Sequence, residues 1–152
     1  MTAVTLEAIE AKQTELSKLI AQFKADANKP VLWTFLETQI ELLPGEHYAG
    51  LVLNDGGHIE HHLVLMAQRP DKKLAWQEAM DWAQSVGGSL PTRQEQALLF
   101  ANCKPHLKPE CHLSNQTHES DASSAWYCYF YDGYQTITLK SYGGSAVAVR
   151  RV

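Results

Sequence analysis

Four tyrosines lie close together near the carboxyl end of the chain: Tyr127, Tyr129, Tyr131 and Tyr134. Successive side chains of a strand point to opposite faces, so three of these phenols would share one face. The opposite, core-facing side would then hold Trp126, Cys128 and Phe130. A tyrosine combines a large, rigid ring with a polar tip, which suits recognition of varied ligands. We therefore predict a ligand-binding surface here. The alternative is that these tyrosines pack against a second helix or form an oligomer interface.

A polar segment just before the tyrosines extends this predicted surface. Residues 105–124 contain two prolines and four serines, a composition typical of a loop. Binding residues are often carried on loops that a rigid scaffold positions. The predicted contacts in this segment are His112, Asn115, Gln116 and His118. An ordinary solvated loop would have the same composition, and that alternative stays open.

Two further groupings could do chemistry, and we expect neither to form a site. His58, Glu60 and His62 would share one face of a strand and could bind Zn²⁺ or Ni²⁺, although an exposed polar face is normal for a hairpin. A cysteine oxidase would need a close thiol pair or a copper-binding pair, whereas no C-x-x-C spacing links Cys103, Cys111 and Cys128. Motifs of hydrolases, nucleotide-binding proteins and zinc proteases are absent from the sequence. We predict no enzyme activity, metal or cofactor.

The elements that must position these residues begin with a β-hairpin. Strands over 48–53 and 58–66 flank the turn sequence Asn54-Asp55-Gly56-Gly57. Residues 31–43 are ambiguous, and we expect a short strand over 40–42 before Pro44. Asp71 is a good N-cap for a helix over 72–86, which Gly87 would end.

A second helix is expected after Thr92, where Thr92 and Glu95 form a capping box. Cys103-Lys104-Pro105 would end it. The remaining predicted strands cover 126–130, 134–139 and 146–152. Two helices beside antiparallel strands indicate an α+β domain.

Composition excludes several classes of protein. The chain has 152 residues, 45% of them hydrophobic and 20% charged, which fits one globular domain with an appendage. Its formal net charge is -4 without a dense basic stripe, so we expect no nucleic-acid partner. No apolar run reaches the ~20 residues of a membrane span. Charges within the first twenty residues argue against a signal peptide, so we expect neither a membrane partner nor Sec-type secretion.

The first thirty residues form a separate element. Seam residues recur at alternating spacings of three and four: Leu6, Ile9, Gln13, Leu16, Ile20, Phe23 and Ala27. This heptad pattern predicts a coiled-coil oligomerisation helix over 1–29 that ends near Pro30, with the second domain covering 30–152. Gln13 would restrict register, and a trimer is favoured over a dimer. A helix packed back on its own domain is the alternative.

Five motifs, read in order, carry a resemblance to a known family. They are Tyr48-Ala49-Gly50-Leu51-Val52-Leu53, Trp76-x-x-Ala79, Gly87-Gly88-Ser89-Leu90-Pro91-Thr92, Ala125-Trp126 with Phe130 and Gly133, and Val147-Ala148-Val149-Arg150-Arg151-Val152. Over residues 38–152 the chain resembles the C-type-lectin-like domains of phages and bacteria. That family is similar in fold to formylglycine-generating enzymes and includes variable proteins of diversity-generating retroelements.

The resemblance implies a C-type-lectin-like fold in which the terminal strands pair and two helices flank antiparallel sheets. It also implies a binding face built from residues scattered through the last third of the chain. On that ground the predicted contacts also include Cys111, Leu113, Asp132 and Thr136. The implied function is recognition of a host-surface protein or glycan by a phage protein, in the virion tail or in host cytoplasm before assembly. A structural tail component and, less favoured, a formylglycine-generating-type oxidase are the alternatives.

Overall fold

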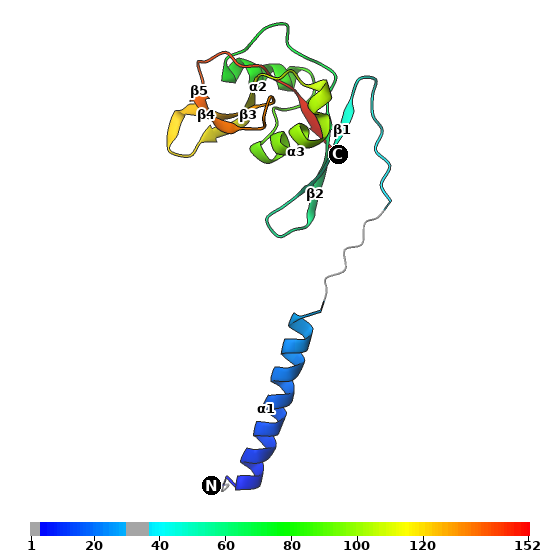
Figure 1. The fold of residues 1–152 in the computed structure, drawn as a ribbon, viewed down its shortest axis with the longest axis vertical. Helices are drawn as coiled ribbons and strands as arrows, with labels where there is room; N and C mark the ends of the chain where they lie inside the picture. The colour runs from blue at the N-terminus through cyan, green and yellow to red at the C-terminus, as the bar shows by residue number, and fades with distance from the viewer. Residues whose placement is uncertain (1–3, 30–36) are drawn as a thin grey trace. The chain divides into compact units, whose positions relative to one another are not determined.

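The computed structural model describes residues 4–29 and 37–152. The chain divides into two compact units, residues 1–38 and 39–152. The described residues have an α+β architecture with three α-helices and two three-stranded antiparallel sheets (Figure 1). Across these ranges, no helix combines the length and apolar content that crossing a bilayer requires. The predicted α+β class is confirmed, whereas the lectin-like assignment stays a prediction.

The first unit contains the helix α1 (Leu6–Ala27), as predicted. The Thr5 hydroxyl accepts a hydrogen bond from the Ala8 amide and so caps the first turn. None of the residues of α1 is buried, and its apolar side chains, including Leu6, Ile20 and Phe23, are exposed. Coiled-coil pairing of this exposed seam stays a prediction. Pro30 and the apolar segment 31–36 lie outside the described residues.

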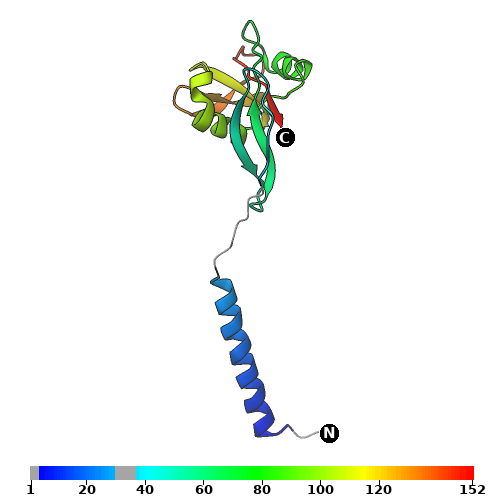
Figure 2. The same ribbon diagram turned by 90° about the vertical axis from the view of Figure 1, so that its right-hand side faces the viewer.

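The first sheet has the strand order β1-β2-β6. Its strands are β1 (His47–Leu53), β2 (Ile59–Leu65) and β6 (Val149–Arg151). The predicted hairpin is therefore confirmed, and Figure 2 shows its two strands beside the C-terminal strand. β6 pairs with β2, which lies between the first and last strands, so the terminal strands share one sheet without pairing directly as the resemblance implied. The strand predicted over 40–42 is wrong, because that segment has no regular secondary structure.

The second sheet has the strand order β3-β4-β5. Its strands are β3 (Cys111–His118), β4 (Asp121–Tyr129) and β5 (Gln135–Leu139). The sequence predicted the hairpin of β4 and β5 but placed β3 in a loop. That prediction is wrong: Cys111, His112 and Leu113 pair in register with β4, despite the polar composition around them.

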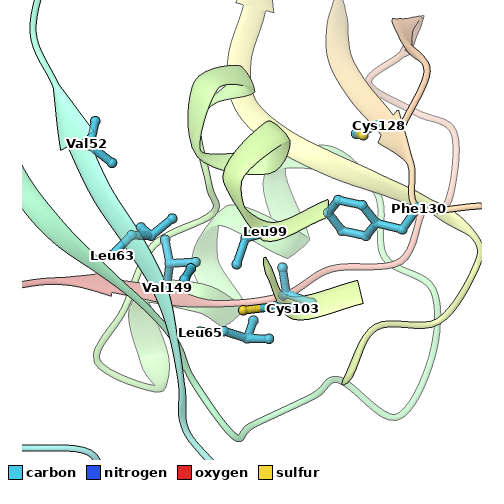
Figure 3. Close-up of a cluster of buried hydrophobic side chains, with 10 residues drawn as sticks. Val52, Leu63, Leu65, Leu99, Cys103, Cys128, Phe130 and Val149 are labelled. Atoms are coloured by element: carbon cyan, nitrogen blue, oxygen red, sulfur yellow. The ribbon is translucent and has the colours of Figure 1, made fainter. Parts of the chain in front are cut away.

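The helix α3 (Arg93–Cys103) begins at the predicted capping box: Thr92 accepts from the Glu95 amide, and the Glu95 carboxylate accepts from the Thr92 amide. A 3-10 turn, η1 (Lys104–His106), follows it. Figure 3 shows side chains of α3 in one cluster with those of both sheets. The cluster includes Leu63 and Val149 of the first sheet, Leu99 and Cys103 of α3, and Cys128 and Phe130. The hydrophobic core thus joins the two sheets through α3.

The helix α2 (Trp76–Ser85) is shorter than predicted. Asp71 is not its N-cap, because the chain first forms a bridge in which the Leu74 amide donates to the Gly144 carbonyl. Helix geometry begins after Ala75, whose amide donates to the Glu78 carboxylate. Gly87, at a φ of 85°, follows the helix and confirms its predicted end. A second apolar cluster around Ala79 and Ala83 attaches α2 to the domain.

Candidate functional site

Three of the four tyrosines are exposed at the turn between β4 and β5. The exposed fractions are 40% for Tyr129, 71% for Tyr131 and 61% for Tyr134. Cys128 and Phe130 are buried in the core cluster, so the predicted alternation of inward and outward side chains is confirmed here. We call Tyr127, Tyr129, Tyr131 and Tyr134 the tyrosine surface.

The turn that carries these rings is tied by hydrogen bonds. The amide of Gly133 donates to the Tyr129 carbonyl, the Tyr129 amide donates to the Tyr134 carbonyl, and the Asp132 carboxylate accepts from the Tyr134 amide. Gly133 has a φ of 83°, and a Cβ there would lie 2.9 Å from the ring of Phe100. The backbone under the exposed phenols is therefore held in one conformation.

Tyr127 is the exception among the four, because its ring is half-buried against the second apolar cluster. Its ring lies 5.4 Å from that of Tyr129 in an edge-on arrangement. Burial raises the pKa of Tyr127, and the neighbouring Cys111, Tyr129 and Tyr134 raise it further. These residues thus form one cluster. Thr136, which pairs with Tyr127 across β4 and β5, is half-buried.

Two residues predicted to contact the ligand are instead part of the protein interior. His112 is 2% exposed and Leu113 is 0% exposed. Leu113 packs under Gly144, where a Cβ would lie 2.8 Å from the leucine side chain. His112 packs on Phe130, and its Nδ1 hydrogen-bonds the Glu110 carbonyl at 3.0 Å. Their placement on an exposed surface was wrong, because β3 is a covered strand and not a loop.

Three further predicted residues gather near the start of α3. Gln116 accepts a hydrogen bond from the Arg93 amide at 2.7 Å. The ring of His118 lies 5.5 Å from that of Trp126, over which the Arg93 guanidinium stacks at 3.5 Å. Trp126 is half-buried in this stack, so the prediction that it faces the core alongside Cys128 and Phe130 is wrong. The backbone amide of Asn115 donates to the Pro91 carbonyl.

The sequence predicted only part of this second group, because it did not identify Arg93 and Gln135. Arg93 and Gln135 hold it together, since the Arg93 Nε donates to Gln135 and the Gln135 side-chain amide donates to the Arg93 carbonyl. The two residues are far apart in the sequence, and no motif joins them. Most of the predicted contacts thus fall into two groups: Cys111, Tyr127, Tyr129 and Tyr134 cluster on one side of the sheet, and Asn115, Gln116 and His118 lie near the start of α3.

The thiols give little support to the oxidase alternative. All three cysteines are free; Cys103 and Cys128 are buried, and Cys111 is half-buried. Burial raises the pKa of Cys111 and of Cys128 to about 11, which opposes formation of a nucleophilic thiolate. Within residues 4–29 and 37–152, no three His, Cys, Asp or Glu side chains are placed to share a metal ion. His62 instead hydrogen-bonds the Tyr48 hydroxyl through Nδ1 at 2.9 Å.

The two comparisons with known proteins found no relative of this chain. No protein-family model matches the chain, and a search of curated proteins finds no significant match. The class of the protein is therefore defined by the fold alone: an α+β domain with two small antiparallel sheets joined through one helix.

Proposed function

We propose that the protein is a ligand-binding module of the C-type-lectin-like kind, encoded by a phage, which presents its tyrosine surface to a protein or glycan on a host cell. The observation that carries this proposal is the exposure of Tyr129, Tyr131 and Tyr134 on one hydrogen-bonded turn. Its place of action is the phage tail, or host cytoplasm before assembly. The family and the host ligand rest on the resemblance described above.

The exposed tyrosine rings are held in place before a ligand binds. Ordering a flexible side chain at an interface costs about 0.5–1.5 kcal/mol, so a binding surface gains affinity when its groups are already held. Tyrosine has only two side-chain torsions, and the turn beneath these rings is tied by three hydrogen bonds. Ring area is therefore offered to a ligand at a small entropic cost.

The helix α1 supports the multivalent part of the proposal. Its apolar side chains form an exposed stripe, and an isolated helix of this length is marginal in water. Assembly of three copies through the heptad seam would cover the stripe. It would also raise a weak affinity by about 10²-fold or more through effective concentration.

The binding test uses the full chain on a glycan array and on intact bacterial cells. Replacing two exposed rings together, Tyr129→Ala with Tyr131→Ala, should abolish binding while leaving the far-ultraviolet circular dichroism spectrum unchanged. Tyr142→Ala is the matched control, because Tyr142 is also exposed but lies outside the turn. Binding that survives the double change, or that is lost equally in the control, contradicts the proposal. Capture of a phage structural protein in place of a cell-surface ligand would favour the tail-component alternative.

The assembly test measures molecular mass in solution. Ile20→Asp places a charge in the seam and should convert the oligomer to monomers. Ala11→Asp adds the same charge at a position off the seam and should leave the oligomer intact. A monomeric wild-type chain would overturn the multivalent part of the proposal without affecting the tyrosine surface.

A further inference from the structure

A cavity of about 350 Å³ lies in the second unit, apart from the tyrosine surface. Three segments that are distant in sequence line it: residues 69–73 after β2, residues 106–112 around the start of β3, and residues 145–146 before β6. The volume is at the lower end of the range for small-molecule sites, about 300–1,000 Å³. The cavity can therefore take a small molecule or one terminal group of a larger one.

The lining of this cavity is positively charged although the chain is acidic. We call Arg69, Lys72, Lys73 and Lys108 the cationic pocket, and these four face only two carboxylates, Asp71 and Glu110. With histidines neutral, four positive and two negative groups leave a formal charge of +2, against -4 for the whole chain. A concave surface lined by one sign of charge focuses the field and attracts ions of the opposite sign.

Most of these cations lack a carboxylate partner within the protein. Lys73 lies 3.7 Å from Glu110, which already accepts a 2.7 Å hydrogen bond from the Ser145 hydroxyl. In the part of the chain that the structure describes, no carboxylate lies within ion-pair distance of Arg69, Lys72 or Lys108. Three positive charges thus line the cavity without a carboxylate at ion-pair distance; Lys108 interacts with Glu110 only from farther away, where it helps to lower the pKa of that carboxyl.

One of these charges is held in place by the backbone. The Nη1 group of Arg69 donates to the carbonyls of Met66 and Gln68. Partial burial of the guanidinium lowers the pKa of Arg69, and the group still remains charged at neutral pH. An anion that entered the cavity would meet a donor already oriented, since the guanidinium has five N–H groups and Nη1 uses only its own.

A buried imidazole supplies a polar wall. His112 lines the cavity and is almost fully buried, and burial lowers its pKa to about 4, so the ring is neutral at pH 7. Its Nδ1 donates to the Glu110 carbonyl, and Nε2 has no hydrogen-bond partner among the described residues. The Nε2 atom of this neutral ring can accept a hydrogen bond from a hydroxyl group of a ligand, while the cations at the rim supply the donors for its charged oxygens.

We propose that the cationic pocket binds a small oxyanion, namely the carboxylate, sulfate or phosphate group of a small molecule or of an acidic sugar. The proposal rests on the cavity, on three cations that have no carboxylate at ion-pair distance, and on an arginine fixed by two carbonyls. It does not depend on the tyrosine surface. A metal cation is disfavoured by the surplus positive charge, and a folded partner would not fit within the cavity volume.

The test titrates the full-length protein with inorganic phosphate, sulfate, glucuronate and uncharged glucose, at constant ionic strength. Nuclear magnetic resonance chemical shifts report where each probe binds. Saturable shifts should concentrate at His112 and Ser145 for at least one anion, and glucose should produce none. The double variant Lys72→Gln with Lys108→Gln should weaken this binding at least about tenfold, since two unpaired charges are lost.

Two controls keep the outcomes distinct. Lys18→Gln removes a charge on α1, and Tyr131→Ala alters the tyrosine surface; both should bind the anion as the wild type does. Comparison of glucuronate with phosphate and sulfate identifies which oxyanion is preferred. The proposal is overturned if no anion gives saturable shifts at the cavity, if glucose binds equally well, or if the double variant keeps wild-type affinity. Loss of cell binding in the tyrosine double variant, with anion binding intact, would separate the two sites.

Discussion

The two sheets of the second unit differ in what their side chains do. In the sheet β1-β2-β6, both arginines of the last strand are paired with buried carboxylates. Arg151 donates two 2.7 Å hydrogen bonds to Glu95, which also bonds His61 at 2.8 Å. Arg150 donates to both carboxylate oxygens of Glu46. These ion pairs connect the arginines of β6 to buried carboxylates and fix the C-terminal strand.

The sheet β3-β4-β5 instead carries exposed aromatic side chains at and beyond the end of β4. Cys128 and His112 are buried on one side of it, whereas Tyr129, Tyr131 and Tyr134 are exposed to solvent. The two sheets thus have different roles within one small domain. The first sheet provides rigidity through internal ion pairs, and the second sheet presents aromatic side chains that are exposed to solvent.

The largest expected effect comes from breaking the ion pair of the first sheet. Glu95→Gln leaves Arg151 without its charged partner inside the protein. Loss of one member of a buried pair typically costs about 3–5 kcal/mol, and the partial exposure of Arg151 reduces this to about 2–3 kcal/mol. Urea denaturation at pH 7 measures the loss as a lower unfolding free energy.

Glu60→Gln is the matched control for this change. Glu60 lies on β2 in the same sheet, is exposed, and should change the unfolding free energy by less than about 0.5 kcal/mol. Equal effects of the two substitutions would show that the pair does not anchor β6, and the contrast between the sheets would then fail.

Lowering the pH should reduce the unfolding free energy by a smaller amount. Burial alone would raise the pKa of Glu95, but hydrogen bonds from Arg151, the Thr92 amide and His61 outweigh it and hold the pKa below its usual 4.5. A carboxyl whose pKa is lower when folded stabilises the protein above its unfolded pKa. This contribution should disappear as the pH falls below about 4.5 through the folded pKa.

Unfolding measured between pH 6 and pH 3 tests this expectation. The wild type should lose more stability over that range than Glu95→Gln, which lacks the titrating group. The Asp121 carboxylate of the second sheet, whose pKa Ser123 and Ser124 lower to about 2, titrates in both proteins and cancels in the difference. Parallel pH curves would contradict the assignment.

Local sequence signals predicted the elements that form locally. The capping box of Thr92 and Glu95 fixed the start of α3 because its hydrogen bonds span three residues. The Asn-Asp-Gly-Gly turn predicted the first hairpin for the same reason. In the candidate site, alternation along one strand predicted the burial of Cys128 and Phe130 and the exposure of Tyr129 and Tyr131.

Elements that depend on distant partners were not predictable. The polar strand β3 exists because it pairs with β4 and is covered by Gly144, whereas its own composition resembles a loop. The start of α2 is displaced from Asp71 because Leu74 pairs with Gly144, seventy residues later in the chain. The cationic pocket was missed because its charges come from segments far apart in sequence. Only pairing and packing bring such residues together.

The smallest expected change in unfolding free energy is within the tyrosine surface. It tests whether the exposed rings serve binding alone or also support the fold. Tyr131 is largely exposed, so Tyr131→Ala should change the unfolding free energy by less than about 0.5 kcal/mol. Tyr127 packs partly on the second apolar cluster, so Tyr127→Ala should cost more, about 1–2 kcal/mol, although less than the ~3–5 of a fully buried ring. Thermal and urea unfolding of both variants measure the difference. A cost for Tyr131→Ala that equals the cost for Tyr127→Ala would mean that the outer rings also support the fold, and the surface would then no longer be free to serve binding alone.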